Sequence, residues 1–567
     1  MKMRNAALSM SLSLLSHACR VGLPVAVAAS CMVACDDEND PKTWVKRLDD
    51  AAQRGAAIKR LDEMFNGAMS SANSNREDPK VKGIIDDAAE PLTKVYTTQQ
   101  LDEKTRKDVM KLIADMGDPR GTPAFAKAFK DYEPGKNDED VKFAAQGTAR
   151  LSTQNKLTDQ GLIDALWDCF SKFKLSQAKS SNLYLDLQMA VKTVKHPTWG
   201  PKAVALLSTP IPTPVTPDIS KDYIIFWQQT AAQLLGELKF TGAVGPLVKA
   251  LMTPTKAELK FPVRNALHKM AKEAEPELIK ALKGEGDYQK LAEAYPERSY
   301  LPLIAEPIAY IGRPSGLAAI IEQLADTKLT PQNRVALTSY LTYWPADAKV
   351  INAYKDSYTK VPADVPIAAM GGGNGHAILV GAAALFFDSS LTDWIVKEYT
   401  NAKGMAADEM PRSALPAAIK LMTAEQTKMV NDAVNKISGP ASEKEMFKSA
   451  SAILDKCKKD DACYLSVLDT PVPSSPLSSK YGHIKAVWMA TMNKGPDTKA
   501  KLLERLEKVK DGDVRLYMIE AIDILSPQGD PAAADKLDKI VETDSKAKVP
   551  GTDEMYRIAL KLRSKVP

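Results

Sequence analysis

The stretch "MGDPRGTPAFAKAF", from Met116 to Phe129, predicts how this chain folds. Upstream of it, Val109, Leu112, Ile113 and Met116 recur at the spacing of one apolar face of an amphipathic helix. Gly-Asp-Pro then breaks the helix, because glycine tolerates backbone angles that end one and proline favours the first turn of the next. The small apolar residues that follow, Ala124 to Phe129, predict a second helix packed on the first.

The same arrangement returns along the chain: a helix, a Gly/Pro turn and a small apolar helix. Six copies end at Phe129, Leu207, Leu251, Leu282, Leu324 and Ile540. Their separations are compatible with a period of about 31 to 44 residues, which is the length of a helix–turn–helix repeat. Such a unit cannot bury its apolar faces alone and must stack on its neighbours. A set of unrelated helical hairpins is the alternative, because Gly/Pro turns between helices are common.

These segments resemble HEAT and HEAT-like repeats of the phycobilisome-lyase type. In that family the first helix often opens with Asp-x-Val-Arg, which corresponds here to Asp513–Arg515, to Asp140–Lys142 and, less closely, to Pro262–Arg264. The resemblance weakens between about residues 330 and 480. It implies an all-α fold, an α-solenoid of roughly ten to twelve antiparallel helix pairs over residues 43–567. It implies little about activity.

Two proline-rich stretches cannot form helix interiors, because proline lacks the backbone N–H and clashes with the preceding turn. They are "STPIPTPVTPD", from Ser208 to Asp218, and "TPVPSSPLSSK", from Thr470 to Lys480. We expect long loops or soft breaks in the solenoid near residues 208–222 and 470–480.

The N-terminal residues predict an export signal. Residues 21–34 are apolar or small, with only Pro24 and Ser30 interrupting, and positive charge precedes them. Fourteen residues suit the apolar core of a signal peptide and are too short to span a bilayer. "MVAC", ending at Cys35, resembles the lipobox of bacterial lipoproteins, with Met32 where leucine is usual. This resemblance implies that residues 1–34 are removed and that Cys35 carries lipid. An ordinary cleaved signal and an uncleaved anchor remain as alternatives.

The acidic residues that follow Cys35 predict a solvated tether over residues 35–42. The whole chain has a formal charge of +5, and loss of the three cations in residues 1–34 lowers it to +2. A nucleic-acid-binding protein would need clustered lysine and arginine, so we expect no nucleic-acid partner. The anticipated location is the cell envelope, where the lipid tethers the protein facing the periplasm or the exterior.

Cys457 and Cys463 flank the charged turn in "DKCKKDDACYL". On one continuous helix these side chains would point apart, whereas across a turn they can reach disulfide distance. An oxidising envelope compartment would keep such a bond. A reduced pair and a metal site are the alternatives, although two further ligands would be needed for metal.

The glycine-rich turn at Gly371, Gly372, Gly373, Asn374, Gly375 and His376 precedes an apolar helix. Such a turn can present backbone N–H groups to an anion. It lacks the Gly-Lys-Ser/Thr ending of a P-loop and the G-x-G-x-x-G spacing of a dinucleotide site. A tight turn before a closely packed helix is the favoured interpretation.

We identify no catalytic, cofactor-binding or metal-binding set. His196, His268, His376 and His483 are far apart in sequence, and none lies in a known ligand or catalytic pattern. Three function classes follow. The leading one is a non-enzymatic scaffold that binds an envelope protein, because stacked repeats create extended surfaces. The others are a ligand-binding or sensory lipoprotein, with its ligand unknown, and a lyase-like enzyme by fold analogy alone.

Overall fold

The computed structural model describes residues 37–178, 182–364, 366–367, 372–439 and 441–566. The described chain divides into two compact units, residues 37–95 and residues 96–567. The first unit contains α1 (Pro41–Lys46), α2 (Arg54–Ser71) and most of α3 (Pro79–Thr98). The side chain of Asp40 accepts a hydrogen bond from the Lys42 N–H and so caps α1. The last residues of the expected tether are therefore part of the first helix.

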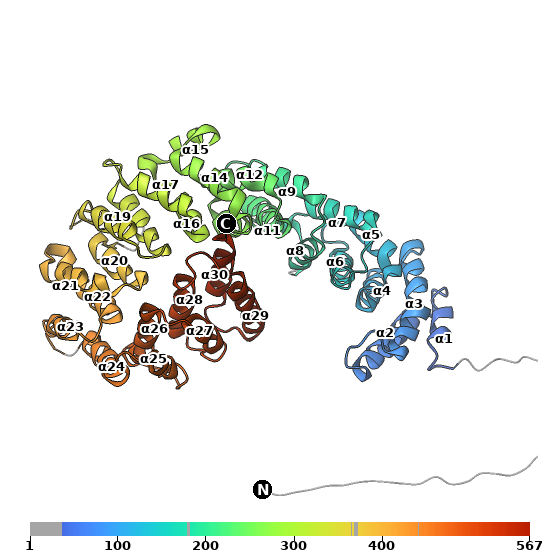
Figure 1. The fold of residues 1–567 in the computed structure, drawn as a ribbon. Helices are drawn as coiled ribbons and strands as arrows, with labels where there is room; N and C mark the ends of the chain where they lie inside the picture. The colour runs from blue at the N-terminus through green and yellow to red at the C-terminus, as the bar shows by residue number, and fades with distance from the viewer. Residues whose placement is uncertain (1–36, 179–181, 365, 368–371, 440, 567) are drawn as a thin grey trace, which may run out of the picture. The chain divides into compact units, whose positions relative to one another are not determined.

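The second unit is an α-solenoid of HEAT-like helix pairs, arranged in two layers (Figure 1). Most helices pack on a neighbouring helix of the other layer and on equivalent helices of adjacent pairs. The first layer contains α4 (Glu103–Met116), α6 (Asp138–Thr153), α8 (Leu183–Val194), α11 (Gln229–Leu238), α13 (Lys260–Lys269), α16 (Leu301–Ile311), α18 (Pro331–Tyr340), α20 (Gly375–Ala382), α22 (Gly404–Leu421), α24 (Ser442–Cys457), α26 (Tyr481–Asn493), α28 (Gly512–Ile524) and α30 (Thr552–Ser564).

The second layer contains α5 (Thr122–Lys130), α7 (Gln160–Lys172), α9 (Trp199–Ser208), α12 (Val244–Leu251), α14 (Ala271–Lys283), α17 (Pro314–Leu324), α19 (Ala348–Thr359), α21 (Thr392–Asn401), α23 (Thr427–Val434), α25 (Asp461–Val467), α27 (Thr498–Leu506) and α29 (Pro531–Ala547). Short elements connect them: α10 (Pro217–Ile219), α15 (Gln289–Glu293), the π-helix η3 (Ser220–Gln228) and 3₁₀ turns that include η5 (Pro254–Leu259), η8 (Leu341–Tyr343), η10 (Ala383–Phe386) and η12 (Leu477–Lys480). The strands β1 (Pro366–Ile367) and β2 (Gly373–Asn374) pair antiparallel.

The stretch from Met116 to Phe129 folds as predicted. Gly117 adopts the left-handed conformation, with φ of 61°, and ends α4, while Asp118 caps the 3₁₀ turn that leads into α5. The apolar faces of both helices are buried. Gly121 is needed for the close approach of these helices, because a Cβ there would lie 2.5 Å from Ile113 Cγ2.

Both proline-rich stretches form loops between helices, at residues 209–216 and 469–476. The solenoid continues across them: α9 packs on α11, and α24 packs on α26. The boundary between the two compact units lies instead at residues 95 and 96.

Buried cationic side chains cap the C-terminal ends of several helices. Arg515 donates to Leu506 O at 2.8 Å, and its side chain has no exposed surface. Lys485 donates to Lys420 O at 2.9 Å, and Lys256 donates to Leu207 O at 2.6 Å. The last carbonyls of a helix have no partner within it and carry partial negative charge, so a cation stabilises them. The Arg of the Asp-x-Val-Arg pattern at residues 513–515 is thus a structural residue.

The C-terminal helix α30 does not contact only its neighbours in the chain. It packs against α13 and α16, more than 250 residues earlier, and Figure 1 shows the helices of the second unit curving back until α30 lies beside α16. Further along, Trp488 on α26 donates to Ala384 O and stacks on Phe387 at 4.5 Å. The C-terminal part of the solenoid therefore brings together helices that are distant in sequence.

Candidate interaction surface

The proposed signal peptide, residues 1–34, and the proposed lipid attachment residue Cys35 lie outside the described residues. Within the part of the chain that the structure describes, no helix is both long enough and apolar enough to cross a bilayer.

Cys457 and Cys463 are joined by a disulfide bond, with their Cα atoms 5.3 Å apart. Cys457 is the last residue of α24, and Cys463 lies in the first turn of α25. The turn between the helices brings the two side chains together, with Lys458 in a positive-φ conformation at 51°. The disulfide bond holds the end of α24 against the start of α25.

The glycine-rich turn Gly371–His376 is described from Gly372 onward. The Asn374 side chain accepts from the N–H groups of His376 and Ala377, at 2.9 and 3.1 Å. The Asn374 N–H in turn donates to the Glu409 carboxylate at 2.6 Å. A protein carboxylate and an amide oxygen therefore already occupy the N–H groups that an external anion would need at this helix start.

Close packing accounts for glycine in this segment. A Cβ at Gly375 would lie 2.9 Å from the methyl groups of both Val335 and Val361. His376 Nε2 donates to Val361 O at 2.6 Å, and the His376 ring lies 4.3 Å from the Tyr358 ring. The geometry agrees with a tight turn before a closely packed helix.

The four histidines lie in separate places. His268 is buried, and burial lowers its pKa to about 3, with Arg557 and Lys561 nearby adding to the effect. His196 lies 2.8 Å from the Thr198 hydroxyl in an exposed turn. Across the described residues, no group of three or more His, Cys, Asp or Glu side chains is arranged to hold a metal ion.

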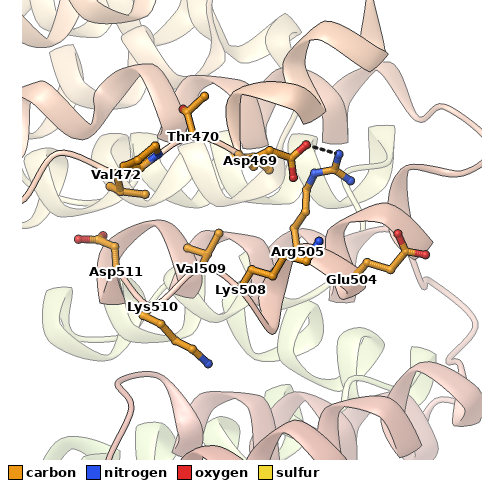
Figure 2. A pocket seen from close by; sticks show the side chains of 11 residues that line it. Asp469, Thr470, Val472, Glu504, Arg505, Lys508, Val509, Lys510 and Asp511 are labelled. Carbon is orange, nitrogen blue, oxygen red and sulfur yellow. Dashed lines mark hydrogen bonds and ion pairs between the residues drawn. The ribbon is translucent and has the colours of Figure 1, made fainter.

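A cleft of about 700 Å³ lies between the loop at residues 468–472 and the segment at residues 504–511 (Figure 2). Arg505 Nη2 pairs with Asp469 Oδ2 across it at 2.7 Å. The Thr470 hydroxyl donates to Val467 O at 2.6 Å, and His483 Nε2 lies 3.1 Å from it. A nucleophilic hydroxyl must donate its hydrogen bond to the general base, whereas the Thr470 hydroxyl donates to a backbone carbonyl. The cleft is lined by side chains of both charges, and the hydroxyl of Thr470, which lines it, is not activated as a nucleophile.

Large apolar side chains are exposed on α8, on η3, which continues directly into α11, and on α13. Leu185 and Met189 on α8 are 50% and 57% exposed, Ile225 on η3 is 37% exposed, and Phe261 on α13 is 59% exposed. Leu185 and Met189 share one face of α8, because they are four residues apart. Gln188, between them, donates to Ile225 O at 3.4 Å, so α8 and η3 are adjacent here. η3 also contacts η5, which ends at Leu259, two residues before Phe261. We call Leu185, Met189, Ile225 and Phe261 the apolar surface. The sequence reading missed them because their apolar character indicated core packing.

No family model and no curated protein sequence matches this chain. Among solved structures, it is similar to a mutant of Kap121p, with 10% sequence identity, a TM-score of 0.34 and coverage of 93% of this chain and 77% of that chain. It is also similar to importin beta crystallised in an ammonium sulfate condition, with 9% identity, a TM-score of 0.29 and coverage of 93% and 79%. At these scores the similarity carries no argument about function.

Proposed function

We propose that this protein is a non-enzymatic scaffold or adaptor that binds another protein through its α-solenoid. The apolar surface is the observation that carries the proposal. Soluble proteins rarely expose several large apolar side chains together unless they contact a partner there. Burial of a fully exposed Leu, Met or Phe side chain contributes about 1.5–3 kcal/mol, and these half-exposed side chains would each contribute about half as much.

The second part of the proposal is the location. We propose that lipid on Cys35 tethers the scaffold to a membrane of the cell envelope, after removal of residues 1–34. The apolar run that ends at Cys35 supports this, as does the acidic segment that follows. A tethered scaffold would hold its partner near the membrane, and the partner would be an envelope protein.

The other function classes have less support. The ligand-binding hypothesis depended on the Gly371–His376 turn, where the N–H groups of Asn374, His376 and the following Ala377 already have protein acceptors. The lyase-like hypothesis depended on fold analogy, and fold alone is weak grounds for chemistry.

Site-specific photo-crosslinking in intact cells tests the proposal. A photoreactive amino acid would replace Met189 or Phe261, which are 57% and 59% exposed. Matched controls would carry it at Leu477 or Leu516, which are 48% and 39% exposed outside the apolar surface. We expect one defined protein adduct from the first two positions and none from the controls.

A second variant checks that the adduct reports binding. With the photoreactive group at Phe261, Leu185→Ser combined with Met189→Ser should weaken capture roughly tenfold or more, because two apolar contacts are lost. Equal labelling at surface and control positions would contradict the proposal, as would capture that the double substitution leaves unchanged.

A further inference from the structure

The first compact unit contains a groove of about 470 Å³, formed by α2, α3 and the start of α1. This volume is within the range of about 300–1,000 Å³ that is typical of small-molecule sites. Apolar residues and glycines line it from both long helices: Met64, Gly67, Ala68, Gly83 and Ile84. Its charged lining residues are Lys80 and Asp87, which have opposite signs. The α2–α3 groove therefore suits an apolar ligand better than an ion.

Two glycines keep this groove open. Gly67 lies within α2 and Gly83 within α3, and a Cβ added at either position would meet no neighbouring atom of the described chain within 4 Å. Packing inside the first unit therefore does not require glycine at these positions, although glycine inside a helix is destabilising relative to alanine. The open space beside the two glycines lets a slender ligand lie close to the backbones of both helices.

The N-terminal end of the described chain lies at this groove. Asn39 and Pro41, just before and at the first residue of α1, are among its lining residues. Trp44 Nε1 donates to Glu38 O at 2.9 Å, which holds the chain against α1 just before the groove. Cys35 precedes Glu38 by three residues, so even a fully extended chain places their Cα atoms at most about 11 Å apart. A long group attached to the Cys35 thiol therefore begins within reach of the groove.

An acyl chain matches the chemistry of the groove better than a peptide segment does. The N–H and C=O groups of a peptide need hydrogen-bond partners where water is excluded. The long walls of the groove are helices, whose backbone groups bond within the helix, and Ser71 Oγ already donates to Gly67 O at 2.9 Å. An acyl chain has no hydrogen-bonding groups, and burial of each of its methylenes is favourable. The proposed lipid on Cys35 supplies such a chain at the edge of the groove.

We propose that the α2–α3 groove binds one acyl chain of the lipid attached to Cys35 of the same protein molecule. The inference rests on the proposed lipid at Cys35 and is independent of whether the apolar surface binds a protein. A lipid with more than one chain can place one in the groove while another enters the bilayer. The lipid then holds the first unit directly at the membrane surface, because only Asp36 and Asp37 separate Cys35 from Glu38.

Photo-crosslinking within one protein molecule tests this site. A diazirine-bearing amino acid would replace Met64, which lines the groove from α2. The full chain would be irradiated in intact cells and digested, and its peptides analysed by mass spectrometry. We expect the peptide with residue 64 to be joined to the Cys35 peptide through the lipid, while the intact protein keeps the mass of one chain. The same probe at Met69, on the same helix but outside the groove lining, should give roughly tenfold less of this adduct.

Filling the groove provides a second test. Gly67→Leu combined with Gly83→Leu places side chains in open space, and leucine favours helix more than glycine does, so the unit can fold. With the probe at Met64, this double substitution should lower the adduct roughly tenfold or more. Gly55→Leu is the matched control, because Gly55 also lies in α2 beside open space but does not line the groove. It should leave the adduct unchanged.

The mass of the Cys35 peptide distinguishes failure of the groove from failure of the proposed anchor. If that peptide carries lipid but gives no adduct with position 64, or as much with position 69, the groove proposal is overturned and the anchor stands. A Cys35 peptide without lipid overturns both. An adduct of position 64 with a membrane lipid, with another protein or with a second copy, which would double the mass, also overturns the proposal. So does an adduct that the double substitution leaves unchanged.

Discussion

Acidification should destabilise the junction around α13 and α30 through a single histidine, His268. The side chain is 5% exposed, and its Nε2 has no hydrogen-bond partner among the described residues. Burial is the main cause that lowers its pKa to about 3, and the nearby cations Arg557 and Lys561 add to it. At neutral pH the imidazole is uncharged, and it must take up a proton when the surrounding helices open in acid.

The size of the effect follows from the two pKa values. An unfolded histidine titrates near its ordinary pKa of 6.5, and the folded one near 3. Because the folded pKa is the lower one, the stabilisation is present above pH 6.5 and is lost as the pH falls from 6.5 towards 3. Between pH 7 and pH 5 the loss should be about 2 kcal/mol. His268→Leu, of similar volume and without a proton to bind, should remove this loss.

Hydrogen exchange measured by mass spectrometry gives the local free energy that the prediction needs. Peptides from α13 and α30 would be compared at pH 7 and pH 5 in the unsubstituted chain and in His268→Leu, after correction for the intrinsic pH dependence of exchange. Comparing the two proteins cancels the contribution of other titrating groups. An equal loss of protection in both proteins would refute the reasoning. His196→Leu, in an exposed turn, is the control and should leave the pH dependence unchanged.

Four further outcomes are expected. Arg515→Met should destabilise the α27–α28 pair by about 3–5 kcal/mol in chemical denaturation, because it removes the main partner of a buried carboxylate. Burial raises the pKa of Glu520 to about 8, so stability should fall as the pH rises from about 4.5 through 8, and Glu520→Gln should flatten that fall in melts at pH 6 and 9. Peptides that contain Cys457 and Cys463 should be two hydrogens lighter before reduction than after it, by mass spectrometry; free-thiol labelling of native protein would contradict this. Cys35→Ser should shift the protein from the membrane fraction to the soluble envelope fraction, or stall its precursor; normal processing with unchanged membrane sedimentation would exclude lipid at Cys35.

Much of the fold could be predicted because its signals are local. The apolar spacing before Met116, the Gly-Asp-Pro turn and the small residues up to Phe129 specify two helices and their contact without reference to the rest of the chain. The placement of Cys457 and Cys463 across a turn was recognisable for the same reason, since the charged residues between them disfavour one continuous buried helix. Each of these features lies within about 20 residues of sequence.

The junction at α30 could not be predicted in this way. In this junction Ser564 Oγ donates to Ile311 O, and Lys561 Nζ donates to Tyr343 O. Both acceptors are backbone carbonyls, which the pattern of side chains cannot reveal. Its donors, Lys561 and Ser564, occur in a basic segment that reads as an exposed helix end. Sequence periodicity shows which face of a helix is polar, but not whether that face meets water or the carbonyl ends of distant helices.

The contacts of α30 with α13 and α16 also change how stability is distributed along the solenoid. In an open array each repeat gains energy only from its neighbours, so damage to one repeat stays local. That description suits the pairs from α4 to α9, which make contacts with nearby elements. From α13 onward, α30 links the middle of the solenoid to its end, so loosening α13 or α16 also removes contacts from α30. These contacts couple repeats that are more than 200 residues apart in sequence. Damage to α13 or α16 should therefore reach the C-terminal repeats, although no repeat between them is altered.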